Sequence, residues 1–234
     1  MRQRIAVILC GGASQRMQTD KNYLQLGNRL MLPTVVERVA AAVAALYLVK
    51  FSSSQPLPDL PPGIPLRVVS ENDFSDPRRA QRGPATAIAN AYQEIVETLE
   101  QPLESCDVFL TGNDYPMLKS MVVQRLFEEM EDSPPEVDAV IPIVDEKLQV
   151  LCCVLRGRCL TSLPAYVEAG GQSLYGWLEE RNLVTVSESS LQLIDPHLHS
   201  FLSVNSPETF QQVCDLMTGG TGNRSNRNTG EKEQ

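Results

Sequence analysis

Short apolar runs alternate with segments of helical periodicity along most of the chain. Residues Ile5–Cys10 are apolar at every position, which is typical of a strand buried on both faces of a sheet. By similar patterns, the other expected strands are Leu46–Phe51, Leu66–Ser70, Asp107–Thr111, Asp138–Val144, Leu148–Arg156 and Leu183–Val186. The expected helices are Thr34–Ala45, Pro84–Leu99, Ser120–Met130, Leu160–Ala169, Leu174–Arg181 and a last one that begins at Ser206-Pro207 and ends at Met217.

This alternation predicts the fold class. Strands that are joined through helices pair in parallel by right-handed crossovers, so we expect a three-layer α/β/α fold with a mostly parallel sheet. A chain of 234 residues suits one such domain, which we place at residues 1–217. Residues 218–234 contain no apolar side chain to bury, and we expect them to form a disordered tail.

Composition narrows the class of protein. Hydrophobic residues make up 42% and charged residues 21% of the chain, as in ordinary globular proteins, and no apolar stretch reaches the roughly 18 residues of a membrane span. The N-terminal apolar run is too short for the core of a signal peptide, and the six cysteines include no C-x-x-C pair, so we expect a cytoplasmic protein with reduced thiols. The net charge of −9 disfavours a general nucleic-acid binder.

The clearest chemical signal follows the first expected strand. The segment LCGGASQRMQTDK, residues 9–21, places Gly11-Gly12 at the strand end and adds the cations Arg16 and Lys21. Glycines let the backbone approach a ligand closely and point N–H groups at phosphate oxygens, and mobile cations neutralise the charge that phosphoryl transfer develops. The segment lacks the G-x-x-x-x-G-K-[ST] and G-x-G-x-x-G spacings. We therefore interpret it as a phosphate-binding loop of another kind rather than a solvated turn.

A second candidate follows the strand expected at Asp107–Thr111. Ligands of open α/β sheets gather at the carboxyl ends of strands, where Asp114 and Gly11-Gly12 should meet. A carboxylate at this place suits Mg²⁺, which takes one or two carboxylates together with phosphate oxygens. From the residues alone, a simple turn before Pro116 accounts for this aspartate equally well.

Four segments resemble one family, in the right order. Residues 9–21 resemble the L-x-G-G-x-S-x-R-M-G-x-D-K signature of the molybdenum cofactor guanylyltransferases, the MobA-like nucleotidyltransferases. Residues 82–88 (RGPATAI), 113–118 (NDYPML) and 202–208 (LSVNSPE) resemble the family's G-P-L-A-G-I, C-D-x-P-F-L and V-N-T-P-E/D segments. The likeness extends over nearly the whole chain short of the tail, and it implies a Rossmann-like nucleotidyltransferase fold.

The resemblance also implies roles for particular residues. The nucleotide site would contain Leu9, Cys10, Gly11, Gly12, Lys21, Asp73 and Asp114, and the acceptor site would contain Asn205. Lys21, Arg16 and Asp114 would act in catalysis, with Asp114 as the ligand of Mg²⁺. Asp76 is the alternative to Asp73 as the aspartate near the base or ribose.

The reaction that the resemblance implies is Mg²⁺-dependent transfer of GMP from GTP to molybdopterin or the molybdenum cofactor, with release of pyrophosphate. The attacking phosphate is already an anion, so alignment and charge neutralisation would carry the rate without a general base. The expected partners are GTP and the pterin, with transient contacts to proteins that deliver or receive the cofactor. Neither nucleic acid nor a membrane is expected.

Departures from the family pattern leave alternatives open. Gln18 and Ala87 stand where the family has Gly, and Ser53 or its neighbour stands where an Asn helps to bind guanine. These changes leave the base and the acceptor open. The alternatives are CTP or another phosphorylated acceptor, and a nucleotide-binding relative without turnover. Retention of Lys21 and Asp114 argues against the last of these.

Overall fold

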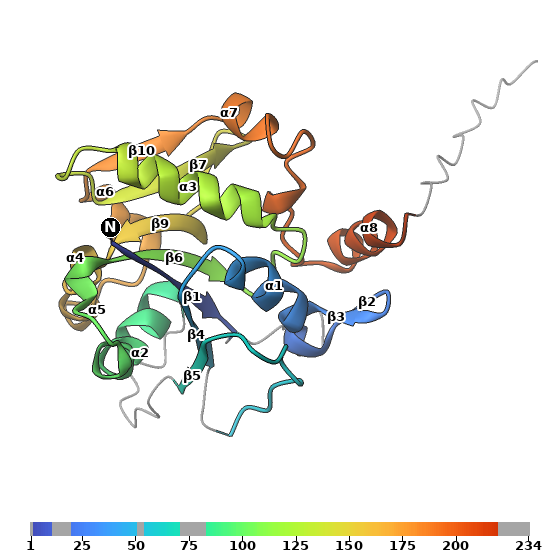
Figure 1. Cartoon of the computed structure of the whole chain (residues 1–234), viewed down its shortest axis with the longest axis horizontal. Helices are drawn as coiled ribbons and strands as arrows, with labels where there is room; N and C mark the ends of the chain where they lie inside the picture. The colour runs from blue at the N-terminus through green and yellow to red at the C-terminus, as the bar shows by residue number, and fades with distance from the viewer. Residues whose placement is uncertain (1, 11–19, 51–53, 71–82, 220–234) are drawn as a thin grey trace, which may run out of the picture.

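The chain folds around one large sheet, seen near the middle of Figure 1. The computed structural model describes residues 2–10, 20–50, 54–70 and 83–219. The sheet order is β10-β7-β9-β6-β1-β4-β5, with β8 paired to β7. β9 runs antiparallel to β6 and β7, whereas β1 pairs in parallel with both β4 and β6. The strands are β1 (Gln3–Leu9), β4 (Ala45–Lys50), β5 (Leu66–Ser70), β6 (Cys106–Gly112), β7 (Ala139–Val144), β8 (Lys147–Leu148), β9 (Cys152–Arg156) and β10 (Leu183–Val186).

Helices cover both faces of the sheet and give the three layers that the sequence predicted (Figure 1). One face carries α1 (Met31–Ala40), α3 (Ser120–Asp132) and α7 (Glu188–Gln192). The other face carries α2 (Pro84–Thr98), α4 (Gly157–Leu160), α5 (Leu163–Glu168) and α6 (Leu174–Glu179).

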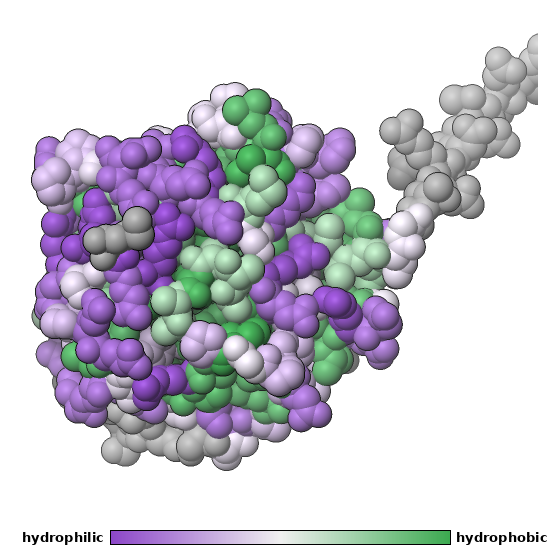
Figure 2. Space-filling view, in the orientation of Figure 1, coloured by the Kyte–Doolittle hydropathy of each residue, from purple (hydrophilic) through white to green (hydrophobic). Residues whose placement is uncertain are grey.

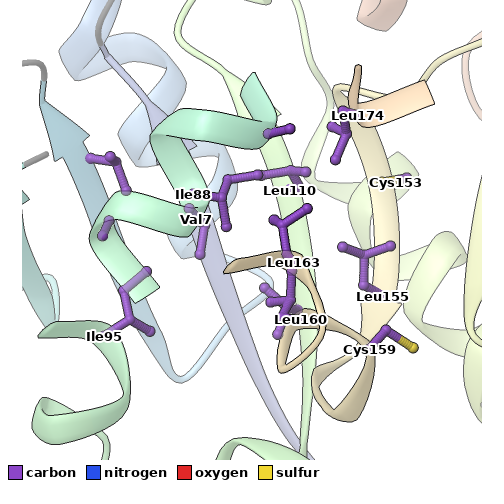
Figure 3. Close-up of a cluster of buried hydrophobic side chains, with 14 of the residues drawn as sticks. Val7, Ile88, Ile95, Leu110, Cys153, Leu155, Cys159, Leu160, Leu163 and Leu174 are labelled. Carbon is purple, nitrogen blue, oxygen red and sulfur yellow. The ribbon is translucent and has the colours of Figure 1, made fainter. Parts of the chain in front are cut away.

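The side chains of β1 alternate between two hydrophobic cores. Val7 and Leu9 join the core beneath α2, whereas Ala6 and Ile8 join the core beneath α1 and α3. Figure 3 shows the first core, where Val7 and side chains of α2 and β6 gather between helix and sheet. A strand with no solvent-facing side needs apolar residues at consecutive positions, which explains the unbroken run at Ile5–Cys10.

The strand order reverses beside β1. The chain passes from β1 through α1 to β4 and β5 on one side, and then through α2 to β6 on the other side. Leu9 and Gly112 are partners in the parallel register, so the carboxyl ends of β1 and β6 lie next to each other. Ligands of open α/β sheets bind at such a reversal.

Three predicted elements differ most from the observed ones. The helix expected at Thr34–Ala45 ends five residues early, because Ala45 pairs with β1 and opens β4. The strand expected at Leu148–Arg156 is interrupted between β8 and β9. The helix expected at Leu160–Ala169 is two short helices, α4 and α5. Pro164 lies in the first turn of α5 and has no N–H to continue a helix from before it.

A smaller hydrophobic cluster joins the last helix to an early hairpin. The hairpin of β2 (Gln25–Leu26) and β3 (Arg29–Leu30) contacts α8 (Pro207–Thr218), and Met31 and Val213 are fully buried between them. Figure 1 shows α8 beside the hairpin, away from the main layers. Figure 2 shows hydrophobic surface over α7 and α8.

Asp107 is buried at the amino end of the sheet between two arginines. Its side chain is 1% exposed, and its Oδ2 accepts a hydrogen bond from Arg156 Nη1 at 3.1 Å. Its Oδ1 accepts a hydrogen bond from Arg2 Nε at 2.7 Å. Arg156 also donates to the carbonyl of Met130 in α3 at 2.7 Å. Since a buried carboxylate is costly unless it is paired, this cluster ties α3 to the strands β6 and β9.

The far C-terminal segment is described only in part. The last helix ends at Thr218 and Gly219 caps it, while residues 220–234 of the expected tail lie outside the described residues. Among the helices that the structure describes, none is long and apolar enough to cross a membrane.

Candidate active site

Leu9 and Cys10 mark the carboxyl end of β1. The carbonyl of Leu9 accepts a hydrogen bond from the N–H of Asn113 at 3.0 Å, which holds the end of β6 against β1. Burial, and secondarily Asp20, raises the pKa of the Cys10 thiol far above its ordinary range. Cys10 therefore remains a neutral thiol and packs as a small apolar side chain.

Asp114 lies just beyond the end of β6, next to this end of β1. Its carbonyl accepts a hydrogen bond from the N–H of Val204 at 2.8 Å, which brings in a segment from near the C-terminus. A methyl carbon added at Gly112 would lie 2.5 Å from Asp114 Oδ1, well inside van der Waals contact. The glycine at position 112 thus leaves the space that the carboxylate occupies.

Lys21 reaches Asp114 from a separate segment. It opens the 3₁₀ turn η1 (Lys21–Tyr23), which Asp20 caps by accepting a hydrogen bond from the N–H of Asn22 at 2.9 Å. The Lys21 Nζ lies 3.8 Å from Asp114 Oδ2 and donates a hydrogen bond to Asn205 Oδ1. A cation, a carboxylate and an amide from three distant parts of the chain therefore meet at the strand ends.

Asn205 is held in place at the start of α8. Its N–H donates to Thr209 Oγ1 at 3.2 Å, and its Nδ2 donates to Ser203 Oγ at 2.8 Å. Ser206 and Thr209 form a capping box that starts the helix. With its Nδ2 bonded to Ser203, Asn205 presents its Oδ1 to Lys21.

The Lys21–Asp114 pair is partly shielded from solvent, with side chains 19% and 16% exposed. Burial raises the pKa of the Asp114 carboxyl, and Lys21, a backbone N–H and Asn205 offset part of that rise. A carboxylate with a raised pKa gains from a nearby cation. Carboxylate and amide oxygens are also the ligands that Mg²⁺ prefers, so Asp114 and Asn205 fit this ion.

The structure brings together five of the predicted site residues at the carboxyl ends of β1 and β6. They are Leu9, Cys10, Lys21, Asp114 and Asn205. The remaining predicted residues lie outside the described residues, and so do two of the positions that depart from the family pattern. These are Gly11, Gly12, Arg16, Asp73 with its alternative Asp76, Gln18 and Ser53.

Two buried asparagines near the site were missed by sequence reasoning. Asn22 is 0% exposed and Asn113 is 8% exposed. Asn113 Nδ2 donates to Asn22 Oδ1 at 2.7 Å, and Asn22 Nδ2 donates to the Cys10 carbonyl at 3.3 Å. The available signal was adjacency, since each asparagine is next to Lys21 or Asp114 in the chain. Adjacency alone does not predict burial.

A cation and a carboxylate that meet where the strand order of an α/β sheet reverses are typical of enzymes that bind nucleotide phosphates. Residues 6–184 match the MobA-like NTP transferase domain. The chain belongs to this family and is a nucleotidyltransferase, as its motifs indicated.

Relatives and solved structures agree with this assignment. The chain is 26% identical over 215 residues to the molybdenum cofactor guanylyltransferase of Desulfosudis oleivorans, covering 92% of this chain and 96% of that protein. It is 25% identical over 208 residues to a probable molybdenum cofactor guanylyltransferase of Natranaerobius thermophilus, covering 89% and 93%. The crystal structure of molybdopterin-guanine dinucleotide biosynthesis protein A from Archaeoglobus fulgidus matches with a TM-score of 0.71 at 18% identity, over 92% of this chain and 99% of that one. This last likeness shows a shared nucleotidyltransferase fold.

Proposed function

We propose that this nucleotidyltransferase moves GMP from GTP to molybdopterin or the molybdenum cofactor and releases pyrophosphate. Relatives that align with about nine-tenths of the chain are named molybdenum cofactor guanylyltransferases. The observation that carries the proposal is the meeting of Lys21, Asp114 and Asn205 at the ends of β1 and β6. Each of the three lies in a segment that resembles a family motif.

In the proposed reaction, an oxygen of the acceptor's phosphate attacks the α-phosphorus of GTP. One P–O bond forms there while the bond from the α-phosphorus to the oxygen that bridges to the β-phosphate breaks, and pyrophosphate leaves with the electron pair. Because the attacking oxygen is already anionic, no side chain has to remove a proton. The protein must instead align the two phosphates and supply positive charge.

The described residues suit these two tasks. The Lys21 ammonium would bind the triphosphate and stabilise the charge that develops on it. Asp114, with Asn205 as a second oxygen donor, would hold Mg²⁺. When bound, the ion would neutralise phosphate charge and fix the shape of the triphosphate. Outside the described residues, the same proposal assigns Gly12 and Arg16 to the phosphates, and Gly11 and Asp73 to the nucleoside.

Release of pyrophosphate with each of GTP, CTP, ATP and UTP tests the proposal. Each triphosphate is supplied with Mg²⁺, with and without molybdopterin. We expect release with GTP, only when the pterin is present, and a guanine dinucleotide product by mass spectrometry. Asp114→Asn is the matched inactive control, because it removes the carboxylate charge at nearly constant size.

The outcomes separate the alternatives. Faster release with CTP would refute the guanine assignment and keep the transferase chemistry. Release of pyrophosphate that requires another phosphorylated acceptor instead of the pterin would refute the pterin as the acceptor. Tight GTP binding without any release would indicate a nucleotide-binding relative that has lost turnover.

A further inference from the structure

A pair of buried amides lies directly beside the Lys21–Asp114 pair. Asn22 is fully buried although it belongs to a turn of three residues, and Asn113 is almost as buried. An amide without solvent costs free energy unless its polar atoms are hydrogen-bonded. The bonds that Asn22 makes therefore constrain whatever they join.

Asn22 joins three segments of the chain. Its Oδ1 accepts a hydrogen bond from Asn113 Nδ2 at 2.7 Å, and its Nδ2 donates to the Cys10 carbonyl at 3.3 Å. Its backbone N–H donates to Asp20 Oδ1 at 2.9 Å. The Cys10 carbonyl also accepts a hydrogen bond from Gln55 Nε2 at 3.3 Å. The end of β1, the turn η1 and the end of β6 are thus fixed to one another through a single side chain.

The bond between the two asparagines has a direct geometric effect. Asn22 follows Lys21 and Asn113 precedes Asp114, so this bond links the two backbone segments whose charged side chains lie 3.8 Å apart. An apolar side chain of similar volume would fill the same space, but it would not fix the relative orientation of the two segments.

We propose that Asn22 is a positioning residue, which holds Lys21 and Asp114 at the separation that nucleotidyl transfer requires. It acts through these two residues and, being fully buried, does not touch the substrate. The inference rests on the proposed function only in that Lys21 and Asp114 act in the transfer. It does not depend on which triphosphate or acceptor is used.

The test is a kinetic comparison of Asn22→Leu with wild type, using the triphosphate that wild type turns over. A displacement of about 1 Å in an active site can cost about 10²-fold in rate. We therefore expect kcat to fall about 10²-fold, with a much smaller rise in KM for the triphosphate, because alignment matters more in the transition state than in the bound state. All rates are measured well below the melting temperature of each variant.

Two further variants separate positioning from a simple loss of stability. Ile95→Ala removes part of a side chain that is 3% exposed in the last turns of α2, and it should lower the melting temperature while leaving kcat near wild type. Asn113→Ala breaks the same amide–amide bond from the other side. It should reproduce the loss of kcat, and the double variant Asn22→Leu/Asn113→Ala should be little slower than the slower single variant.

Each outcome decides the proposal. A kcat for Asn22→Leu equal to that of Ile95→Ala would overturn it, and so would fully additive losses in the double variant. If Asn22→Leu does not fold, Asn113→Ala alone decides, by the same comparison of a large fall in kcat with a small rise in KM. Turnover of CTP instead of GTP would refute only the proposed substrate. A wild-type protein that transfers nucleotide from none of the four triphosphates would overturn both the substrate assignment and the positioning role.

Discussion

Replacing Gly112 by Ala should disable the site without unfolding the protein. The backbone φ of Gly112 is not in the left-handed region, so alanine can adopt the local conformation. The new methyl carbon would lie 2.5 Å from Asp114 Oδ1. Since ordinary contact begins near 3.4 Å, the carboxylate has to move by about 1 Å.

That displacement sets the expected magnitude. A shift of about 1 Å in a catalytic group can cost about 10²-fold in rate, which corresponds to about 2.7 kcal/mol of transition-state stabilisation. The stability of the fold should change by no more than about 1 kcal/mol, because a glycine-to-alanine change in unstrained backbone also restricts the unfolded chain. Activity and stability should therefore separate clearly in Gly112→Ala.

The assay is steady-state release of pyrophosphate, with the melting temperature measured in parallel. If Gly112→Ala acts through Asp114, it should add little to the loss already caused by Asp114→Asn, and the double variant should be about as slow as Asp114→Asn alone. A Gly112→Ala protein with wild-type turnover would refute the reasoning, and so would multiplicative losses in the double variant.

Three more changes test other parts of the structure. Asp114→Asn should raise the melting temperature at pH 7. Burial raises the pKa of Asp114 in the folded protein, so the stability that its protonated form contributes is lost as the pH rises above about 4 and through the folded pKa. In thermal melts from pH 4 to 8, the melting temperature of the variant should therefore decline less than that of wild type. Arg156→Met should cost about 3 kcal/mol in urea unfolding, because it leaves the buried Asp107 with one partner; a loss below about 1 kcal/mol would contradict this. Val213→Ala should cost roughly 2 kcal/mol and lower kcat/KM by loosening the segment that carries Asn205, whereas unchanged kinetics would mean that the segment is held independently of α8.

Much of the fold was predictable because buried strands have a distinctive sequence pattern. The run Ile5–Cys10 is apolar at consecutive positions because both faces of β1 are covered, and that pattern fits few other structures. The predicted boundaries of helices and strands were wrong where strand pairing outweighs the local propensity for helix. Ala45 belongs to an alanine-rich helical pattern, yet it forms the first rung of β4 against Ile5. The hairpin Gln25–Leu30 was missed because two-residue strands carry almost no periodic signal.

The residues of the candidate site also include some that the sequence predicted and some that it did not. Lys21, Asp114 and Asn205 were predictable because each lies in a segment with a recognisable order of residues. Asn22 and Asn113 were not, since asparagine is a common turn residue and its burial depends on a carbonyl that another segment provides. Local patterns thus predict candidate groups for the chemistry, whereas the buried amides that contact the same segments are seen only in the folded structure.

The bond between Lys21 and Asn205 also bears on how the protein is made. The two residues are 184 positions apart, so at roughly 5–20 residues per second the ribosome delivers the second about 10–40 s after the first. Strands β1, β4 and β6 all precede Asn113, so the centre of the sheet can pair during that interval. A growing chain can therefore build the sheet while it still lacks the amide that completes the group around Lys21. A truncated chain that ends before Asn205 would therefore be expected to lack the amide that completes this group.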